Sequence, residues 1–423
     1  MQITDGTELI DPHAYARAGY PHAVWARLRR ESPVHWCEPA LVMPFWAVTR
    51  HAQICEVSKQ PDLFLNAKGI LPATREVAER IARGEQGPFD LMRTIITMDP
   101  PKHRKFRRVA SPWLSPRALA RLGTMVEASA RRLVDGLYEA QVGGEGVCDF
   151  ATEVAALHPL RILSSILGVS REDEPHILRI TQQLFAGDDP EFQREEADRE
   201  EGFRNLGIEF LRYFGKIIAD RRERPRDDLA SVLANAQIDG ERMGDLETLG
   251  YYLITFTAGH DTTRNSLAGG MLALVEHPDE REKLRRNPAG RVADAVEEIV
   301  RWTTPVNYMM RTAARETELA GAKIREADRL LLFYASANRD EAVFEDPWAF
   351  RIDRRPNPHL GFGIGEHFCL GAHLARSSQR ALFQELFERL EDIALAAPPE
   401  QLAASFVAGI KHLPIRYRLA PRA

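Results

Sequence analysis

The spacing of hydrophobic and polar residues is helical over most of this chain. Residues 13–31 have the pattern of one amphipathic helix near the start of the chain. Helical spacing then continues almost without interruption from about residue 116 to residue 300. A final helix is expected directly after residue 369. Helices therefore make up most of the predicted structure.

Short stretches that alternate between apolar and polar residues indicate a smaller β region. Residues 34–36 and 45–49 alternate in this way and predict a hairpin. After residue 305 the chain turns to short strands, of which 330–333 is the clearest, and a second hairpin is predicted over 406–419. The expected fold class is therefore mainly α with a minor β region, an α+β fold.

One predicted helix, from Asp245 to Glu276, differs from the others in its length and its middle. It would be roughly 45 Å long at a rise of 1.5 Å per residue. It is apolar on nearly every face over residues 251–256, as expected for a helix inside a core. Residues 258–263, in contrast, include a glycine, a carboxylate and two threonines, which weaken a buried helix. Either the helix bends there with its polar groups satisfied internally, or a groove with a chemical role opens.

Composition and charge exclude some classes of protein. The 423 residues include 56 Lys and Arg against 61 Asp and Glu, a formal net charge of −5. This balance argues against non-specific binding to nucleic acid, and no nucleic-acid motif is present. No linker-like or repeated segment interrupts the chain, so we expect residues 1–423 to form a single domain.

The chain also has the features of a cytoplasmic protein without a membrane segment. Its first residues lack the basic start and apolar centre of a secretory signal. The longest run without charge, residues 248–260, is shorter than the roughly 20 residues that span a bilayer. The 4 cysteines are scattered, which fits a reducing compartment better than a disulfide framework. They are Cys37, Cys55, Cys148 and Cys369.

A glycine-rich loop from Phe362 to Gly371 holds a single cysteine, Cys369, just before the predicted final helix. A thiolate suits iron, and the positive end of a helix dipole lowers the pKa of a thiol. Gly363 and Gly365 allow backbone angles with which the main chain can lie flat against a large planar ligand. A lone cysteine is more often a small buried hydrophobic residue, and a zinc site would need further ligands.

The complete pattern of this loop, Phe-Gly-x-Gly-x-His-x-Cys-x-Gly, resembles the haem-binding loop of the cytochrome P450 family, in its soluble bacterial class. Residues 258–263, Ala-Gly-x-Asp-Thr-Thr, resemble the oxygen-activation motif on the long central helix of that family. The resemblance implies a triangular helix-rich lobe beside a small β-rich lobe. It also implies haem b, iron protoporphyrin IX, with Cys369 as the axial ligand of the iron.

The resemblance implies further roles for individual residues. Asp261 and Thr262 would be catalytic, delivering protons to dioxygen. Glu298 and Arg301, joined by Arg354 from a later loop, would be a buried structural trio that supports the cysteine loop. By themselves, Glu298 and Arg301 could equally be an exposed pair on one helix face. The haem contacts would be His103, Arg107, Arg311, His367, Cys369, Ala258, Phe362, Gly363 and Gly371.

The activity implied by the resemblance is that of a haem-thiolate monooxygenase. Such an enzyme inserts one oxygen atom from O2 into a C–H bond of a small-to-medium hydrophobic substrate. A terpenoid is favoured, while an aromatic compound, a steroid or a fatty acid remains open. A loop over residues 89–96 and a lid over residues 185–192 would help to close the pocket. The pocket residues would be Ile254, Thr257, Ala258, Val306, Phe406 and Val407.

No flavin or iron–sulfur domain is present, so a separate ferredoxin-type donor with its reductase would supply electrons. A basic face near the cysteine could receive an acidic donor, although an ordinary exposed charged face is equally consistent. The alternatives are a peroxide-driven haem-thiolate enzyme and a non-catalytic protein that binds haem or a hydrophobic ligand. The Asp261–Thr262 pair argues against both. The basic residues concerned are Lys102, Arg104, Lys105 and Arg108.

Overall fold

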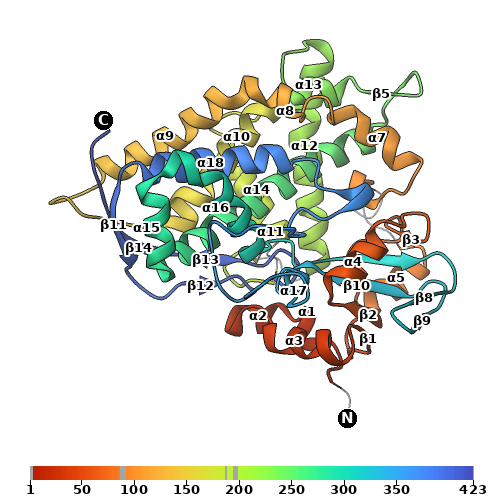
Figure 1. Ribbon diagram of the computed structural model, residues 1–423. Helices are drawn as coiled ribbons and strands as arrows, with labels where there is room; N and C mark the ends of the chain where they lie inside the picture. The colour runs from red at the N-terminus through yellow and green to blue at the C-terminus, as the bar shows by residue number, and fades with distance from the viewer. Residues whose placement is uncertain (1–2, 86–91, 186–187, 194–198, 423) are drawn as a thin grey trace.

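The computed structural model describes residues 3–85, 92–185, 188–193 and 199–422. Figure 1 shows the longer helices gathered in one part of the molecule and a sheet with shorter helices in another. This division into a helix-rich and a β-rich part confirms the predicted fold class. Within the described residues, no helix combines the length and the apolar character needed to cross a bilayer.

Four long helices contribute side chains to the main core. Leu267, Met271 and Leu274 are buried together with residues of the neighbouring helices. A Cβ atom at Gly270 would lie 2.6 Å from a methyl carbon of Ile299, so only glycine allows this close approach of two helices. The four helices are α9 (Gly123–Glu139), α14 (Asp245–Glu276), α16 (Pro288–Thr303) and α18 (Ala372–Phe387), while the buried residues of α10 (Leu157–Leu167) belong to a second core cluster.

The bounds of α14 are those predicted for the long helix. The stretch from 116 to 300 is helical as predicted except for the strand β4 (Gly146–Asp149), the short pair β5 (Gln237–Ile238) and β6 (Glu241–Arg242), and connecting loops. Besides α2 and α3, which are described next, the other α-helices of the described residues are α1 (Thr7–Ile10), α4 (His51–Ser58), α5 (Arg75–Ala82), α7 (Lys102–Ala110), α8 (Pro116–Leu119), α11 (Glu174–Phe185), α12 (Arg199–Glu223), α13 (Leu229–Ala234), α15 (Pro278–Arg286) and α17 (Tyr334–Ala337).

The prediction of one helix over residues 13–31 was wrong, because two helices occupy this stretch. Helix α2 (Pro12–Ala18) ends at Gly19, whose φ of 67° is costly for other residues. Helix α3 (His22–Glu31) then begins after Pro21. Helical periodicity survives on both sides of the break, which explains why the pattern alone looked continuous.

The main sheet has five strands in the order β1-β2-β10-β7-β3. Strands β1 and β2 form the predicted antiparallel hairpin, with Val34 opposite Val48. Strand β10 contains the predicted segment 330–333 and pairs parallel to β2. The five strands are β1 (Val34–Cys37), β2 (Phe45–Val48), β3 (Phe64–Leu65), β7 (Tyr308–Ala313) and β10 (Arg329–Phe333), and a small separate hairpin joins β8 (Thr317–Leu319) to β9 (Ala322–Ile324).

The predicted hairpin over residues 406–419 was wrong. Strand β13 (Ile410–His412) pairs with β12 (Glu400–Gln401). Strand β14 (Pro414–Leu419) instead lies between β11 (Leu390–Leu395) and β4. Only Leu413 separates β13 from β14, which is too short for a hairpin turn, and the alternating apolar residues of β14 are buried in the main core.

Candidate active site

The loop around Cys369 has a backbone that its glycines make possible. Gly363 and Gly365 have positive φ angles of 67° and 77°. A Cβ atom at Gly365 would lie only 2.3 Å from the carbonyl oxygen of Ser58, at the end of α4. The amide of Cys369 donates to the carbonyl of Phe362 over 2.9 Å, which closes the loop on itself. The cysteine is therefore presented from a tight turn that no bulkier residue at 365 would permit.

Cys369 is accessible to solvent although protein surrounds it closely. Burial raises the pKa of its thiol, whereas the amides of Gly371 and Ala372 and the charges of Arg107 and Arg376 act in the opposite direction. Burial outweighs them, so the pKa of the free thiol stays raised, and a metal ion bonded to sulfur would supply the deprotonation. An accessible thiol with these neighbours fits an iron ligand.

Side chains of helix α7 hold the cysteine loop, which lies more than 250 positions later in the sequence. Arg107 donates to the carbonyl of Phe368 over 2.6 Å. Arg104 donates to both carboxylate oxygens of Glu366, at 2.9 Å and 3.3 Å. His103 lies 3.3 Å from the same carboxylate. The loop is therefore fixed to α7 on both sides of His367.

Four of the predicted haem contacts, His103, Arg107, Arg311 and His367, form a cluster of positive and donor groups. The rings of His103 and His367 are 4.1 Å apart. Nε2 of His367 is buried and has no hydrogen-bond partner among the described residues. Burial, followed by the charges of His103, Arg311 and Arg107, lowers the pKa of His367 to about 2. Such a cluster is suited to a dianionic ligand, so these residues fit the two carboxylates of haem.

The side chains on one face of α14 are only partly covered by the rest of the protein. Ile254, Ala258 and Thr262 recur every four residues and are each half-buried, while Phe256 and His260 on other faces are buried. Ala258, predicted as a haem contact, and Ile254, predicted for the pocket, therefore share a face with Thr262. This stripe fits the predicted surface beside a large planar cofactor.

The hydroxyls of two threonines on α14 bond back to the helix. Thr262 donates to the carbonyl of Ala258 over 2.5 Å. Thr257 donates to the carbonyl of Leu253 over 2.7 Å. Thr257, predicted for the pocket, is buried, so the structure does not place it on the accessible stripe. Asp261 is buried beside His260, with Oδ1 of the carboxylate 3.2 Å from Nδ1 of the ring.

The remaining predicted pocket residues lie side by side. Val306 and Val407 form an isolated antiparallel bridge. The ring of Phe406 is 5.7 Å from that of Tyr308. Two segments about a hundred positions apart in sequence thus meet, as the pocket prediction requires. The predicted 89–96 loop is described only from residue 92, so its first part lies outside the described residues.

Glu298, Arg301 and Arg354 form a buried trio. Arg301 donates to both oxygens of Glu298, at 2.7 Å and 2.8 Å, and Arg354 approaches the same oxygens at 3.2 Å. The neighbouring Arg355 instead pairs with Asp294 at the surface. Asn357 also donates to Glu298 over 3.2 Å, and this contact ties the trio to the chain that leads into the cysteine loop.

A second ion cluster next to the loop was not found from the sequence. Arg376 of α18 pairs with Glu297 at 2.6 Å, and its guanidinium lies 4.3 Å from the ring centre of Phe362. Burial alone would raise the pKa of Glu297, but Arg376 and His359 hold it at about 2. The sequence places Arg376 seven residues after Cys369 but gives no sign that it pairs with Glu297.

Three of the four basic residues proposed to receive an electron donor are already in ion pairs. Lys102 pairs with Glu247, Arg104 with Glu366 and Lys105 with Asp239, at 3.4 Å, 2.9 Å and 2.6 Å. Arg108 donates through Nε to the carbonyl of Arg104. The excess of positive charge on this face is therefore smaller than the sequence suggests.

The predicted lid over residues 185–192 is described at residue 185, the end of α11, and over 188–192, which pack against the β12–β13 hairpin; residues 186–187 lie outside the described residues. Asp189 is buried and accepts hydrogen bonds from Lys411 and from the amide of Ala403, at 3.2 Å and 3.0 Å. Phe192 packs against Leu402. A buried charge pair and an apolar contact together fix this segment.

His412 adds a pH-dependent contact to this segment, because its ring lies 2.6 Å from Asp149 and 2.9 Å from Glu191. Burial lowers the pKa of His412, but the two carboxylates outweigh it, and the pKa is raised. Since the folded pKa exceeds the unfolded value, the stabilisation is complete below about pH 6.5 and is lost as the pH rises through the raised value.

We therefore expect His412→Gln to lower the free energy of unfolding by up to about 1 kcal/mol near pH 6, and by almost nothing near pH 9. Urea unfolding across this pH range measures the difference. His13→Gln, at an exposed histidine, is the matched control and should show no such trend. A difference that stays constant with pH would contradict the contact.

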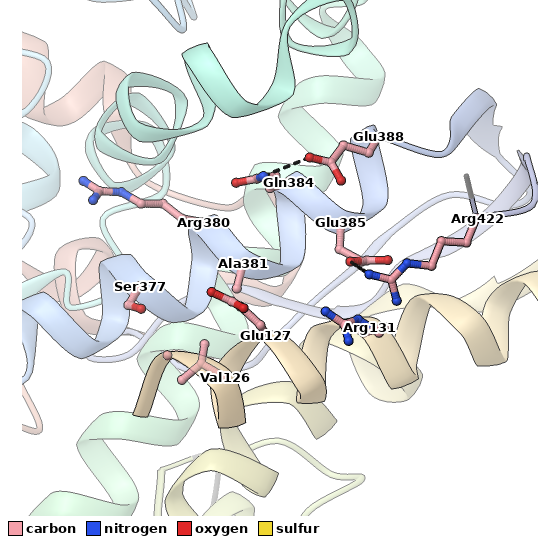
Figure 2. Close-up of a pocket in the computed structure, with 11 residues that line it drawn as sticks. Val126, Glu127, Arg131, Ser377, Arg380, Ala381, Gln384, Glu385, Glu388 and Arg422 are labelled. Carbon is pink, nitrogen blue, oxygen red and sulfur yellow. Dashed lines mark hydrogen bonds and ion pairs between the residues drawn. The ribbon is translucent and has the colours of Figure 1, made fainter. Parts of the chain in front are cut away.

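The depression in Figure 2 lies between α9 and α18 and has a volume of about 450 Å³. Acidic and basic side chains, among them Glu127, Arg131 and Arg380, line it. None of the predicted site residues takes part, so we assign it no role in the chemistry.

Known proteins resemble this chain in sequence and in fold. The sequence model described as "Cytochrome P450" matches residues 65–392. A curated relative, cytochrome P450-terp of Pseudomonas sp, is 37% identical over 421 residues, which cover 97% of each chain.

Two solved structures are also similar. CYP108D1 of Novosphingobium aromaticivorans has a TM-score of 0.88 and 39% identity, with 98% of each chain covered. CYP268A2 of Mycobacterium marinum, solved in complex with pseudoionone, has a TM-score of 0.85 and 35% identity, with 93% of this chain and 94% of that chain covered.

Proposed function

Because this chain belongs to the cytochrome P450 family and is a haem b monooxygenase, we propose that it hydroxylates a small-to-medium hydrophobic molecule, in the first place a terpenoid. The observation that carries the assignment of the site is the accessible Cys369 beside the cluster of His103, Arg107, Arg311 and His367. A thiolate and a group of donors next to each other match the two polar features of haem, its iron and its carboxylates.

Haem supplies an iron centre that activates dioxygen, and a thiolate ligand favours cleavage of the O–O bond. We assign Cys369 to the iron and the four cationic or donor residues to the carboxylates. Phe362, Gly363 and Gly371 would shape the loop that holds the haem, and Ala258 of α14 would contact the haem from the other side of the site. The trio of Glu298, Arg301 and Arg354 keeps the loop in place and takes no part in the chemistry.

Asp261 and Thr262 handle protons in this proposal. The hydroxyl proton of Thr262 is engaged by the carbonyl of Ala258, so its oxygen is left to accept a hydrogen bond from a group beside the stripe. Asp261 is the adjacent carboxyl group. Oδ2 of Asp261 is buried and has no partner among the described residues, so it can take up and release a proton.

Thr262→Ala should separate electron consumption from product formation. We expect product per NADH oxidised to fall about tenfold or more, with hydrogen peroxide released instead, because the threonine oxygen no longer holds the proton path. Thr262→Ser should restore most of the coupling. Thr248→Ala removes a hydroxyl with the same bond to a carbonyl four residues earlier in α14 and should leave coupling unchanged. Equal coupling in Thr262→Ala and wild type would contradict the role.

The substrate class rests on the apolar side chains of Ile254, Val306, Phe406 and Val407, which favour a hydrophobic ligand. The likeness to cytochrome P450-terp and to a structure that contains pseudoionone supports a terpenoid. A spectral screen tests this choice: terpenoids should shift the ferric haem from low to high spin at lower concentration than steroids, fatty acids or aromatic hydrocarbons. A stronger response from one of those classes would replace the terpenoid.

We further propose a separate ferredoxin-type protein as the electron donor. Turnover with NADH, a ferredoxin and its reductase should exceed turnover driven by hydrogen peroxide. Higher turnover with peroxide alone would favour the peroxide-driven alternative. Haem and ligand binding without turnover under either condition would favour a non-catalytic protein.

A further inference from the structure

The contacts of His260 determine which of its ring nitrogens carries a hydrogen beside Asp261. Nε2 of His260 lies 2.9 Å from the carbonyl oxygen of Ala156. A carbonyl oxygen only accepts hydrogen bonds, so Nε2 carries the hydrogen. The other ring nitrogen, Nδ1, lies 3.2 Å from Oδ1 of Asp261. A neutral ring with its hydrogen on Nε2 and an ionised Asp261 would place two lone pairs against each other at this distance.

We propose that His260 and Asp261 hold one proton between them, and that His260 is a positioning residue that keeps this proton on the catalytic carboxyl group. The inference rests on the proposed role of Asp261 in proton delivery. The pair has two forms, a protonated ring beside a carboxylate and a neutral ring beside a carboxylic acid. In both forms a single hydrogen bridges Nδ1 and Oδ1.

Burial makes this shared proton part of the fold. His260 is 0% exposed and Asp261 is 3% exposed, so water cannot easily replace either partner. The ring of His260 stacks at 20° on that of Phe256, with centroids 6.3 Å apart, and this packing fixes its orientation. An unbridged contact between two acceptors in such surroundings would be costly.

The buried cation Arg264 favours release of the proton. Arg264, one turn along α14, is buried; burial lowers its pKa, and the charge of Asp261 acts most strongly in the opposite direction. The more distant carboxylates of Asp149, Glu191 and Asp189 act in the same sense as Asp261. No ion pair joins Arg264 to Asp261 among the described residues, so the guanidinium does not displace the bridging proton. Once the proton leaves, Arg264 stabilises the carboxylate that remains.

The transfer balances without any electron change. Rotation of the protonated carboxyl group of Asp261 brings its O–H bond from His260 toward the site. That O–H bond breaks as the proton passes to an acceptor oxygen in the site, and neutral His260 and an Asp261 carboxylate remain. One proton from solvent then restores the pair. Thr262, the next residue, lies on the accessible face where the transfer ends.

Two substitutions distinguish storage of a proton from support of the fold. The amide of His260→Asn can still donate to Asp261 but cannot give up a proton, whereas His260→Phe keeps only the stacking. We expect both variants to form at least about threefold less product per electron consumed. In wild type the coupling should fall as the pH rises, and in both variants this fall should begin at a lower pH. A purely structural role predicts that the asparagine variant stays coupled, which would overturn the proposal.

His158 provides a matched control. It is also buried and bonded at both nitrogens, to Ser129 and to the carbonyl of Ser378, each at 3.0 Å. His158→Asn should lower stability to a similar extent but leave the coupling and its pH profile as in wild type. Loss of coupling in this variant as well would show that general destabilisation causes the effect.

Spectroscopy on the resting holoenzyme tests the proton without turnover. Nitrogen-15 NMR of the diamagnetic carbon-monoxide complex reports the state of His260, assigned by its loss in His260→Phe. Infrared difference spectra against Asp261→Asn report a protonated carboxyl group. We expect a doubly protonated ring or a carboxylic acid band. A neutral ring without hydrogen on Nδ1 beside an ionised Asp261 would overturn the inference, even if the enzyme is an active monooxygenase. Absence of the thiolate-haem spectrum would instead refute the proposed function.

Discussion

Cys369→Ala is expected to abolish turnover and to remove the long-wavelength band that marks thiolate-ligated haem in the reduced carbon-monoxide complex. The reason is that the sulfur is the only soft ligand in a loop whose shape is set by Gly363, Gly365 and the bond from Cys369 to Phe362. The cationic cluster around His367 is untouched by this change. The variant should therefore still bind haem, more weakly, with an altered spectrum.

Absorption spectra of the reduced carbon-monoxide complexes, with haem content measured in parallel, provide the test. Cys148→Ala is the matched control, because Cys148 is a buried thiol in the main core and has no part in the site. It should cost some stability and leave the band in place. An unchanged band in Cys369→Ala would disprove the ligand assignment, and loss of the band in both variants would point to misfolding.

Glu298→Gln is expected to lower the free energy of unfolding by about 3–5 kcal/mol. Glu298 and Arg301 are both 0% exposed, and Arg354 shares the same carboxylate. Removing the negative charge leaves two buried guanidinium groups without a counter-charge. The cysteine loop should loosen as well, because Asn357 also depends on this carboxylate.

Urea unfolding measures the stability, and the rate of haem transfer to an acceptor protein measures the hold on the cofactor. Asp294→Asn is the matched control on the same helix, since it breaks only the exposed pair with Arg355. That change should cost less than about 1 kcal/mol. Equal losses in the two variants would contradict a special role for the buried trio.

The parts of the fold that could be predicted are those in which local pattern and tertiary environment agree. Helix α14 is buried at most positions between Thr248 and Leu274, so its helical pattern predicted both of its bounds. The break at Gly19 and the pairing of β14 with β11 and β4 were missed, because one depends on a single residue's φ angle and the other on burial against distant helices.

Within the site, family motifs led to individual residues, but charge pairing over long distances could not be seen. Arg104 looked like a free cation on a docking face, yet its partner Glu366 lies far away in sequence. Arg376 and Glu297 gave no local signal of their contact. The orientation of His260, on which the shared proton depends, comes from a carbonyl on another helical segment.

The bond from Arg107 to Phe368 and the pair of Arg104 with Glu366 also have a consequence for biosynthesis. An early helix and a loop near the other end of the polypeptide must meet before the cysteine is held in its turn. While the ribosome is still making the last part of the chain, the contacts between α7 and the cysteine loop cannot yet form. Stable incorporation of the prosthetic group is therefore a late event in the maturation of this enzyme, and nascent chains that stop before the loop would leave the ribosome colourless.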